Sequence, residues 1–109
     1  MDEESTKKLQ ELQILEQNLQ ASVMQKQNIQ LEKNEVENAL EELSKTKDDV
    51  YKIVGGLMIK SDKESVKKDL EEKKKLIDAK MSSVDKQEKL IEEKAEELKK
   101  DLNSNLSKK

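Results

Sequence analysis

The sequence predicts a fold dominated by α-helix, an antiparallel two-helix coiled-coil hairpin with one β-hairpin at its centre. Only 32% of the 109 residues are hydrophobic and 43% are charged, so we expect no broad globular core. Apolar residues nevertheless recur at alternating steps of three and four, which is the heptad pattern of a coiled coil. There is no Pro, and the two Gly are adjacent at Gly55 and Gly56, so the helices are interrupted at one central point.

The first helix is expected over residues 6–46. No glycine or proline interrupts this stretch, and its non-seam positions include many Gln, a good helix former. One stripe of the helix, here called the first seam, keeps the heptad spacing throughout and is mostly apolar. The first seam consists of Leu12, Leu15, Leu19, Ser22, Lys26, Ile29, Lys33, Val36, Leu40 and Leu43.

A β-hairpin is expected over residues 50–60, where two β-prone runs flank the adjacent glycines. A two-residue loop would pair Val54 with Leu57, whereas a three-residue loop would pair Ile53 with Leu57, and the sequence leaves both registers open. Because an isolated two-stranded ribbon is marginal in water, we expect the missing strands to come from other subunits. The residues expected to serve this assembly are Val50, Tyr51, Ile53, Val54, Gly55, Gly56, Leu57, Met58 and Ile59.

The second helix is expected over residues 62–104, followed by a frayed tail at 105–109, and the whole chain, 1–109, is expected to be a single domain. Ser61 and Glu64 have the spacing of a capping box, which predicts the start of this helix. Its own heptad stripe, the second seam, is Leu70, Lys74, Ile77, Met81, Val84, Glu88, Ile91, Ala95, Leu98 and Leu102.

Two helices joined by a short connection fold back as an antiparallel pair, so the two seams are expected to face each other. In that register Lys26 and Glu88 lie side by side as polar positions of otherwise apolar seams. We therefore expect them to contact each other and to fix the alignment of the helices.

At the far end of the helix pair, the same register gathers a group of apolar residues, here called the tip residues. Since the last turns fray, we expect them to expose apolar surface suited to weak capture of non-native chains. The alternative is that these leucines only close the last turn of the coil. The tip residues are Leu9, Leu12, Ile14, Leu15, Leu98, Leu102 and Leu106.

Composition argues against several other functions. Without Cys or His, and without a phosphate-binding glycine loop, we expect no enzyme, no cofactor and no metal site, and the acidic pairs Asp48–Asp49 and Glu92–Glu93 lack the ligand pattern of a calcium loop. All 22 basic residues are Lys, which makes nucleic acid an unexpected partner. No apolar run is long enough for a membrane span and the amino terminus is acidic, so we expect a cytoplasmic protein.

One segment carries a family resemblance. The run Val-Tyr-Lys-Ile-Val-Gly-Gly-Leu-Met-Ile-Lys at 50–60 resembles the Tyr-Lys-x-Val-Gly-x-Leu hairpin of β-class prefoldin subunits, of the archaeal type. The segment Asp-Lys-Gln-Glu-Lys-Leu at 85–90 is similar to the Lys-Gln-Glu segment of that family's second helix, and the Gln-rich first helix is similar in style.

The resemblance implies a hexamer of two α-class and four β-class subunits, whose hairpins join an intersubunit β-barrel. It further implies an ATP-independent chaperone that holds unfolded client proteins at the tips and delivers them to a group II chaperonin. A structural coiled-coil hairpin scaffold without chaperone activity is the alternative.

Overall fold

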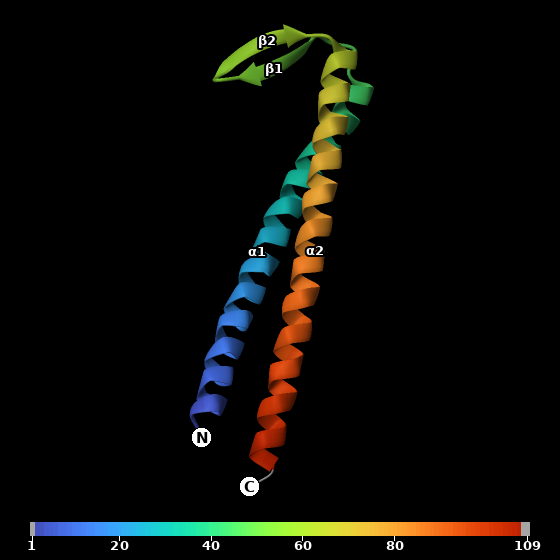
Figure 1. The fold of residues 1–109 in the computed structure, drawn as a ribbon. Coiled ribbons are helices and arrows are strands. Elements are labelled where there is room, and N and C mark those ends of the chain that lie inside the picture. Colours follow the sequence, from blue (N-terminus) through green and yellow to red (C-terminus); the bar gives the residue numbers. More distant parts are fainter. Residues whose placement is uncertain (1, 108–109) are drawn as a thin grey trace. The chain divides into compact units, whose positions relative to one another are not determined.

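The computed structural model describes residues 2–107, with the side chains of residues 105–107 excepted. Helix α1 (Glu3–Lys45) is followed by strands β1 (Val50–Val54) and β2 (Leu57–Ser61) and by helix α2 (Lys63–Ser107), as Figure 1 shows. The predicted fold of the single chain, two antiparallel helices with one central β-hairpin, is confirmed.

The chain divides into two compact units. The arm-end unit combines Met1–Gln27 with Ser82–Lys109, and the hairpin unit is Asn28–Met81. In the arm-end unit, Lys8 lies 3.7 Å from Asp101 and Lys26 lies 2.9 Å from Asp85, so residues ascend along α1 as they descend along α2. In the hairpin unit the same order holds for the pairs Lys33–Asp78, at 3.1 Å, and Glu37–Lys74, at 3.7 Å. Each unit is therefore an antiparallel helix pair.

Helix α1 begins at Glu3, earlier than the expected start at residue 6, because Asp2 caps it. The Ser5 amide donates to Asp2 Oδ1 at 2.7 Å, and the Thr6 amide donates to the Asp2 carbonyl at 3.1 Å. This is the geometry of an N-cap aspartate, which supplies a partner to an amide that has none within the helix. The acidic side chains of Glu3 and Glu4 in the first turn add a favourable interaction with the helix dipole.

The predicted capping box at Ser61 is wrong. Strand β2 extends through Ser61, whose hydroxyl donates to the Ile59 carbonyl at 3.2 Å. The first bond of α2 runs from the Val66 amide to the Asp62 carbonyl at 3.0 Å, which puts Asp62 at the N-cap position. Because Ser61 still pairs with Val50 in the sheet, the cap moves to the next residue.

Helix α2 continues to Ser107, beyond its expected end at residue 104. Asn103, Ser104 and Asn105 have lower helix propensity than Ala or Lys, but by no more than about 0.7 kcal/mol each. No Gly or Pro follows them to end the helix. A few weak helix formers are therefore not enough to stop a helix that extends this far.

Burial follows the two predicted seams, and every position of both is buried or half-buried. In the hairpin unit the buried residues are Ile29, Val36, Leu43 and Ile77, and Ile77 is only 1% exposed. In the arm-end unit Leu12, Val84, Ala95 and Leu102 are buried, together with Ser5 and Ser22. The core of each unit is thus the stripe where one helix meets the other.

The β-hairpin adopts the two-residue loop. Val54 pairs with Leu57 and Ile53 with Met58, which decides between the two registers that the sequence left open. Gly55 and Gly56 both have positive φ, at 55° and 82°, as a type I′ turn requires. Two adjacent glycines meet this requirement without steric cost, and the twist of such a turn matches that of the strands.

Candidate binding surfaces

The β-hairpin is apolar on both of its faces. Because directly paired residues share a face, Tyr51, Ile53 and Met58 lie on one side with Lys60. The other side, here called the root face, carries Val50, Val54, Leu57 and Ile59 together with Lys52 and Ser61.

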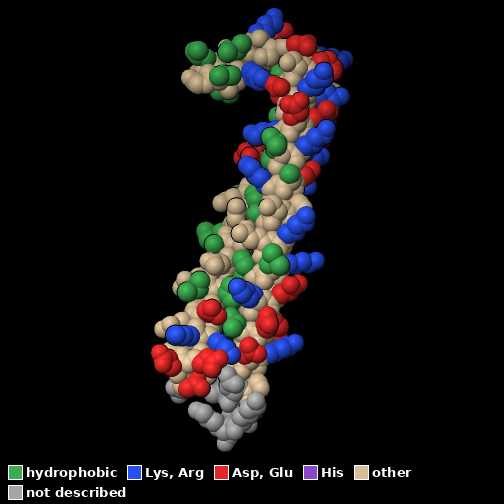
Figure 2. All heavy atoms as spheres, in the orientation of Figure 1, with side chains coloured by type: hydrophobic (Ala, Val, Ile, Leu, Met, Phe, Trp, Pro, Cys, Tyr) green, Lys and Arg blue, Asp and Glu red, His purple; other side chains and the backbone are tan. Residues whose placement is uncertain are grey.

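These side chains are open to solvent. Tyr51, Ile53, Val54, Leu57, Met58 and Ile59 are each about half to three-quarters exposed, and Val50 is half-buried. Figure 2 shows the hydrophobic side chains of the hairpin gathered where it projects from the helices of its unit. The described part of the chain offers only two strands, so both outer edges of this ribbon lack a strand partner there.

Polar contacts hold the hairpin against the helices of its own unit. Lys52, on the root face, forms an ion pair with Asp69 of α2. Lys63, at the start of α2, donates to the Thr46 carbonyl at 3.1 Å and so ties the start of α2 to the end of α1. One ion pair thus links the hairpin to α2.

At the arm end, the structure places the tip residues in three environments. Leu12 and Leu102 are buried with Ala95 in a small cluster. Leu9, Leu15 and Leu98 are partly buried against this cluster, and Ile14 is 57% exposed. The side chain of Leu106 lies outside the described residues. The apolar surface available here is consequently supplied by Ile14 and by the uncovered parts of Leu9, Leu15 and Leu98.

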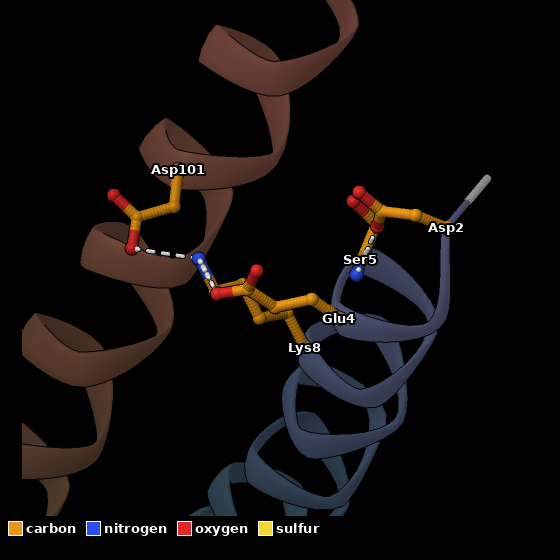
Figure 3. Close-up of polar contacts among 5 residues, drawn as sticks. All are labelled: Asp2, Glu4, Ser5, Lys8 and Asp101. Atoms are coloured by element: carbon orange, nitrogen blue, oxygen red, sulfur yellow. Dashed lines mark hydrogen bonds and ion pairs between the residues drawn. The ribbon is translucent and has the colours of Figure 1, made fainter.

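Charged side chains of α1 and α2 meet at the arm end, as Figure 3 shows. The Lys8 ammonium lies 3.8 Å from Glu4 of the same helix and 3.7 Å from Asp101 of α2. Pairs at such distances and exposure contribute little stability, about 0–1 kcal/mol each. Packing of the leucines, rather than these ion pairs, holds the arm end together.

Lys26 and Glu88 lie together, and Asp85 joins them. The Lys26 Nζ atom is 2.9 Å from Asp85 Oδ1 and 3.3 Å from Glu88 Oε2. The hydrogen bond to Asp85, and secondly the Glu88 carboxylate, raises the pKa of Lys26 above its usual value. The two contacts of Lys26 differ in kind: Asp85 accepts at 2.9 Å, whereas the buried Glu88 Oε2 lacks good hydrogen-bond geometry, so the ammonium stabilises it chiefly as a nearby charge.

Sequence reasoning missed a group of exposed apolar residues outside the tip and the hairpin. In the arm-end unit these are Val23, Met24 and Leu90, and in the hairpin unit Leu31 and Leu76. None lies on a seam, and a signal for those of α1 was present, since Lys26 is the only charged residue from 17 to 31. In a chain that is 43% charged, an almost uncharged helix segment such as residues 17–31 indicates exposed apolar side chains.

Two further properties bear on the kinds of ligand. Within residues 2–107, no three acidic side chains gather as they would around a cation. Over the same range, neither helix contains a stretch long and apolar enough to cross a bilayer.

Comparison with known proteins gives the family. Residues 6–109 match the family described as prefoldin subunit. The prefoldin subunit beta of Methanothrix thermoacetophila is 42% identical over 100 residues, which cover 90% of this chain and 83% of that protein. The corresponding subunit of Pyrococcus furiosus is 37% identical over 90 residues, covering 81% of this chain and 77% of that one.

A solved structure agrees with these relatives. The crystal structure of the prefoldin beta subunit from Thermococcus strain KS-1 superposes with a TM-score of 0.89 at 36% identity, covering 96% of this chain and 94% of that chain. The family match, the sequence identity and the shared architecture of helix, β-hairpin and helix all agree. This chain belongs to the prefoldin family and is of the archaeal beta-subunit type.

Proposed function

We propose that this chain is an ATP-independent chaperone subunit that binds non-native polypeptides at the tip residues and delivers them to a group II chaperonin. Its family is non-enzymatic, and membership implies a chaperone role within a prefoldin complex. We also propose that the protein acts in the cytoplasm.

The observation that carries membership of a larger assembly is the exposure of apolar side chains on both faces of the β-hairpin. A ribbon this apolar is costly to leave in water, since each Å² of apolar surface removed from water is worth about 25 cal/mol. Strands from other subunits would cover it. We propose that those subunits are an α-class prefoldin subunit and further copies of this chain, two α with four β, joined through an intersubunit β-barrel.

Client binding is supported by the division among the tip residues. Leu12 and Leu102 form a buried base, while Ile14, Leu9, Leu15 and Leu98 offer apolar surface above it. Non-native chains share uncovered apolar side chains, and an apolar surface binds them without requiring a particular sequence. The exposed apolar surface at one tip is small, so each chain would bind a client weakly and reversibly. Binding would gain strength when several subunits hold one client at once.

Substituting Ile14 tests this site without unfolding the helix pair. We expect Ile14→Ser to reduce suppression of client aggregation several-fold in the assembled chaperone, because it removes exposed apolar surface at the tip. Leu76→Ser is the matched control, since Leu76 is 66% exposed but lies in the hairpin unit, and it should leave suppression unchanged. Equal activity of both variants and the unsubstituted protein, with assembly intact, would rule out tip binding through Ile14.

The burial of Leu12 and Leu102 favours a second candidate, a hairpin scaffold in which these leucines only close the coil. A scaffold predicts no suppression of client aggregation by the unsubstituted assembly. The same assay therefore separates the two functions before any variant is made.

A further inference from the structure

An open groove of about 320 Å³ lies between α1 and α2 within the arm-end unit. Two small residues of α1 account for it, because Ser22 stands at a seam position that usually holds a larger apolar side chain, and Ala21 lies beside it. Every lining residue is uncharged, although 43% of the chain is charged. The lining residues are Asn18, Ala21, Ser22, Gln25, Gln87 and Ile91.

Four of these side chains carry hydrogen-bonding groups that the chain itself does not use. Asn18, Gln25 and Gln87 are exposed, and within the described residues their carboxamides form no hydrogen bond to another group of the chain. The same holds for the hydroxyl of Ser22, although Ser22 is only 6% exposed. Since a buried polar side chain normally has a partner, Ser22 indicates that the groove receives a polar ligand.

The carboxamides are distributed along the groove and come from both helices. Asn18 and Gln25 are two turns apart on α1, a rise of about 10.5 Å, which an extended polypeptide spans in about three residues. The ion pairs of Lys26 with α2 place Gln87 at the level of Gln25, on the other side of the groove. Donors and acceptors therefore line both sides of a path that suits an extended chain.

The main chain of an extended polypeptide matches this groove. Each peptide unit has one donor and one acceptor, and a carboxamide likewise donates and accepts. The main chain is uncharged, as the groove is, whereas an ionic ligand would meet no counter-charge among the lining residues. In a folded protein nearly all main-chain groups are already paired, so such a groove distinguishes a non-native chain from a folded one.

We propose that this groove, here called the carboxamide groove, binds an extended, uncharged stretch of a non-native polypeptide through hydrogen bonds to its main chain. The inference rests on the proposed function and adds a second kind of recognition to it. The tip residues offer apolar surface to client side chains, whereas the carboxamide groove offers hydrogen bonds to main-chain groups that every client has.

N-methylation of a client peptide tests the proposal, because it removes main-chain donors and leaves every side chain in place. The probe is an unstructured peptide of alternating apolar and uncharged polar residues, prepared with and without N-methyl groups at every second amide. In fluorescence anisotropy with the assembled chaperone, we expect N-methylation to weaken binding at least about threefold.

Matched variants show whether this difference arises in the groove. Asn18→Ala combined with Gln25→Ala should lose most of the difference between the two peptides. The control combines Gln13→Ala with Gln20→Ala, which have the same spacing on the same helix but do not line the groove, and it should keep the difference. Ile14→Ser should weaken binding of both peptides by the same factor. Because the peptides are the same in every titration, a change in the ratio of their affinities reports on the protein.

Ser22→Leu supplies an independent measurement, since it fills the groove from its floor. A leucine suits a seam position, so we expect the helix pair to stay folded by circular dichroism while the difference between the peptides is lost. If N-methylation has no effect on binding to the unsubstituted assembly, or if both groove variants keep the difference, the groove proposal is overturned and tip binding stands. Equal loss in the Gln13 and Gln20 control would overturn it as well. If neither peptide binds the unsubstituted assembly, the proposed function itself is overturned.

Discussion

Lys26 occupies a seam position where a coiled coil normally has an apolar side chain, and its ammonium contacts Asp85 and Glu88. Replacing it by Gln would leave the half-buried Glu88 carboxylate without its counter-charge, which destabilises the helix pair. We expect Lys26→Gln to lower the melting temperature measured by circular dichroism. The double variant Lys26→Leu with Glu88→Leu should recover the loss, because two apolar side chains suit the seam.

The difference in stability between the unsubstituted chain and Lys26→Gln depends on pH, and the direction of the pKa shift of Lys26 gives the pH range. The pKa of Lys26 is raised above 10.5 in the folded chain. The stability it contributes is fully present below the pKa of an unfolded lysine, about 10.4, and is lost as the pH rises through the higher folded pKa. On the alkaline side, the gap in stability between the unsubstituted chain and Lys26→Gln should therefore close only above pH 10.5, and a gap that closed near neutral pH would contradict the assignment.

The two glycines of the hairpin loop make different demands. Gly55, at φ 55°, has a conformation that Asn adopts well, so Gly55→Asn should change the free energy of unfolding by less than about 0.5 kcal/mol. Gly56, at φ 82°, would be strained with a β-branched side chain, and Gly56→Val should cost about 1–2 kcal/mol. An added Cβ meets no atom within 4 Å at either position, so the difference measured in urea is conformational. Equal costs for both variants would argue against this turn.

At the scale of single residues, the sequence predicted contacts better than turns and caps. The seam spacing was enough to bring Lys26 beside Glu88, because helix geometry and a fixed register leave little freedom. The loop register was not predictable, since both alternatives place glycine at positive φ. The cap of α2 was misassigned because Ser61 and Asp62 are both good N-cap residues, and only strand pairing decides between them.

The end of the helix pair shows at the scale of an element why burial must be known before a variant is chosen. Leu12 is 8% exposed and Ile14 is 57% exposed, although they are close in sequence and both apolar. We expect Leu12→Ala to lower the free energy of unfolding by about 2 kcal/mol, through lost packing, and Ile14→Ala by less than about 0.5 kcal/mol. Urea unfolding measures both, and similar values would mean that the leucine cluster does not support the arm end.

The helices themselves were predictable because their pattern is long and regular. Both seams keep their spacing over many turns, and every seam position is buried or half-buried. The ends were less predictable, because a cap depends on one residue and a few hydrogen bonds. Asp2 extends α1 to Glu3, and α2 passes through weak helix formers to Ser107. The exposure of Ile14 follows from its position off the seam, whereas heptad spacing does not give the depth to which each seam leucine is buried.

At the scale of the whole molecule, the β-hairpin explains why a chain of this composition would not act alone. The helix pairs bury their seams within the chain, whereas the hairpin leaves six large apolar residues exposed on both faces. The sequence predicted this imbalance from the lack of further β-prone segments. It could not predict the open groove of about 380 Å³ that Thr46, Asp49 and Val50 line together with Val66 and Leu70 of α2, because residues far apart in the sequence form it.

The central claim is that the hairpin joins this chain to other subunits. Light scattering of the purified 12.6 kDa chain, alone and mixed with an α-class prefoldin subunit from the same source, measures the absolute mass of what forms. The account predicts a mixed species with the mass of four copies of this chain and two of its partner. A mass that stays at that of a monomer in both samples would contradict it, because the apolar faces of the hairpin would then have no subunit to cover them.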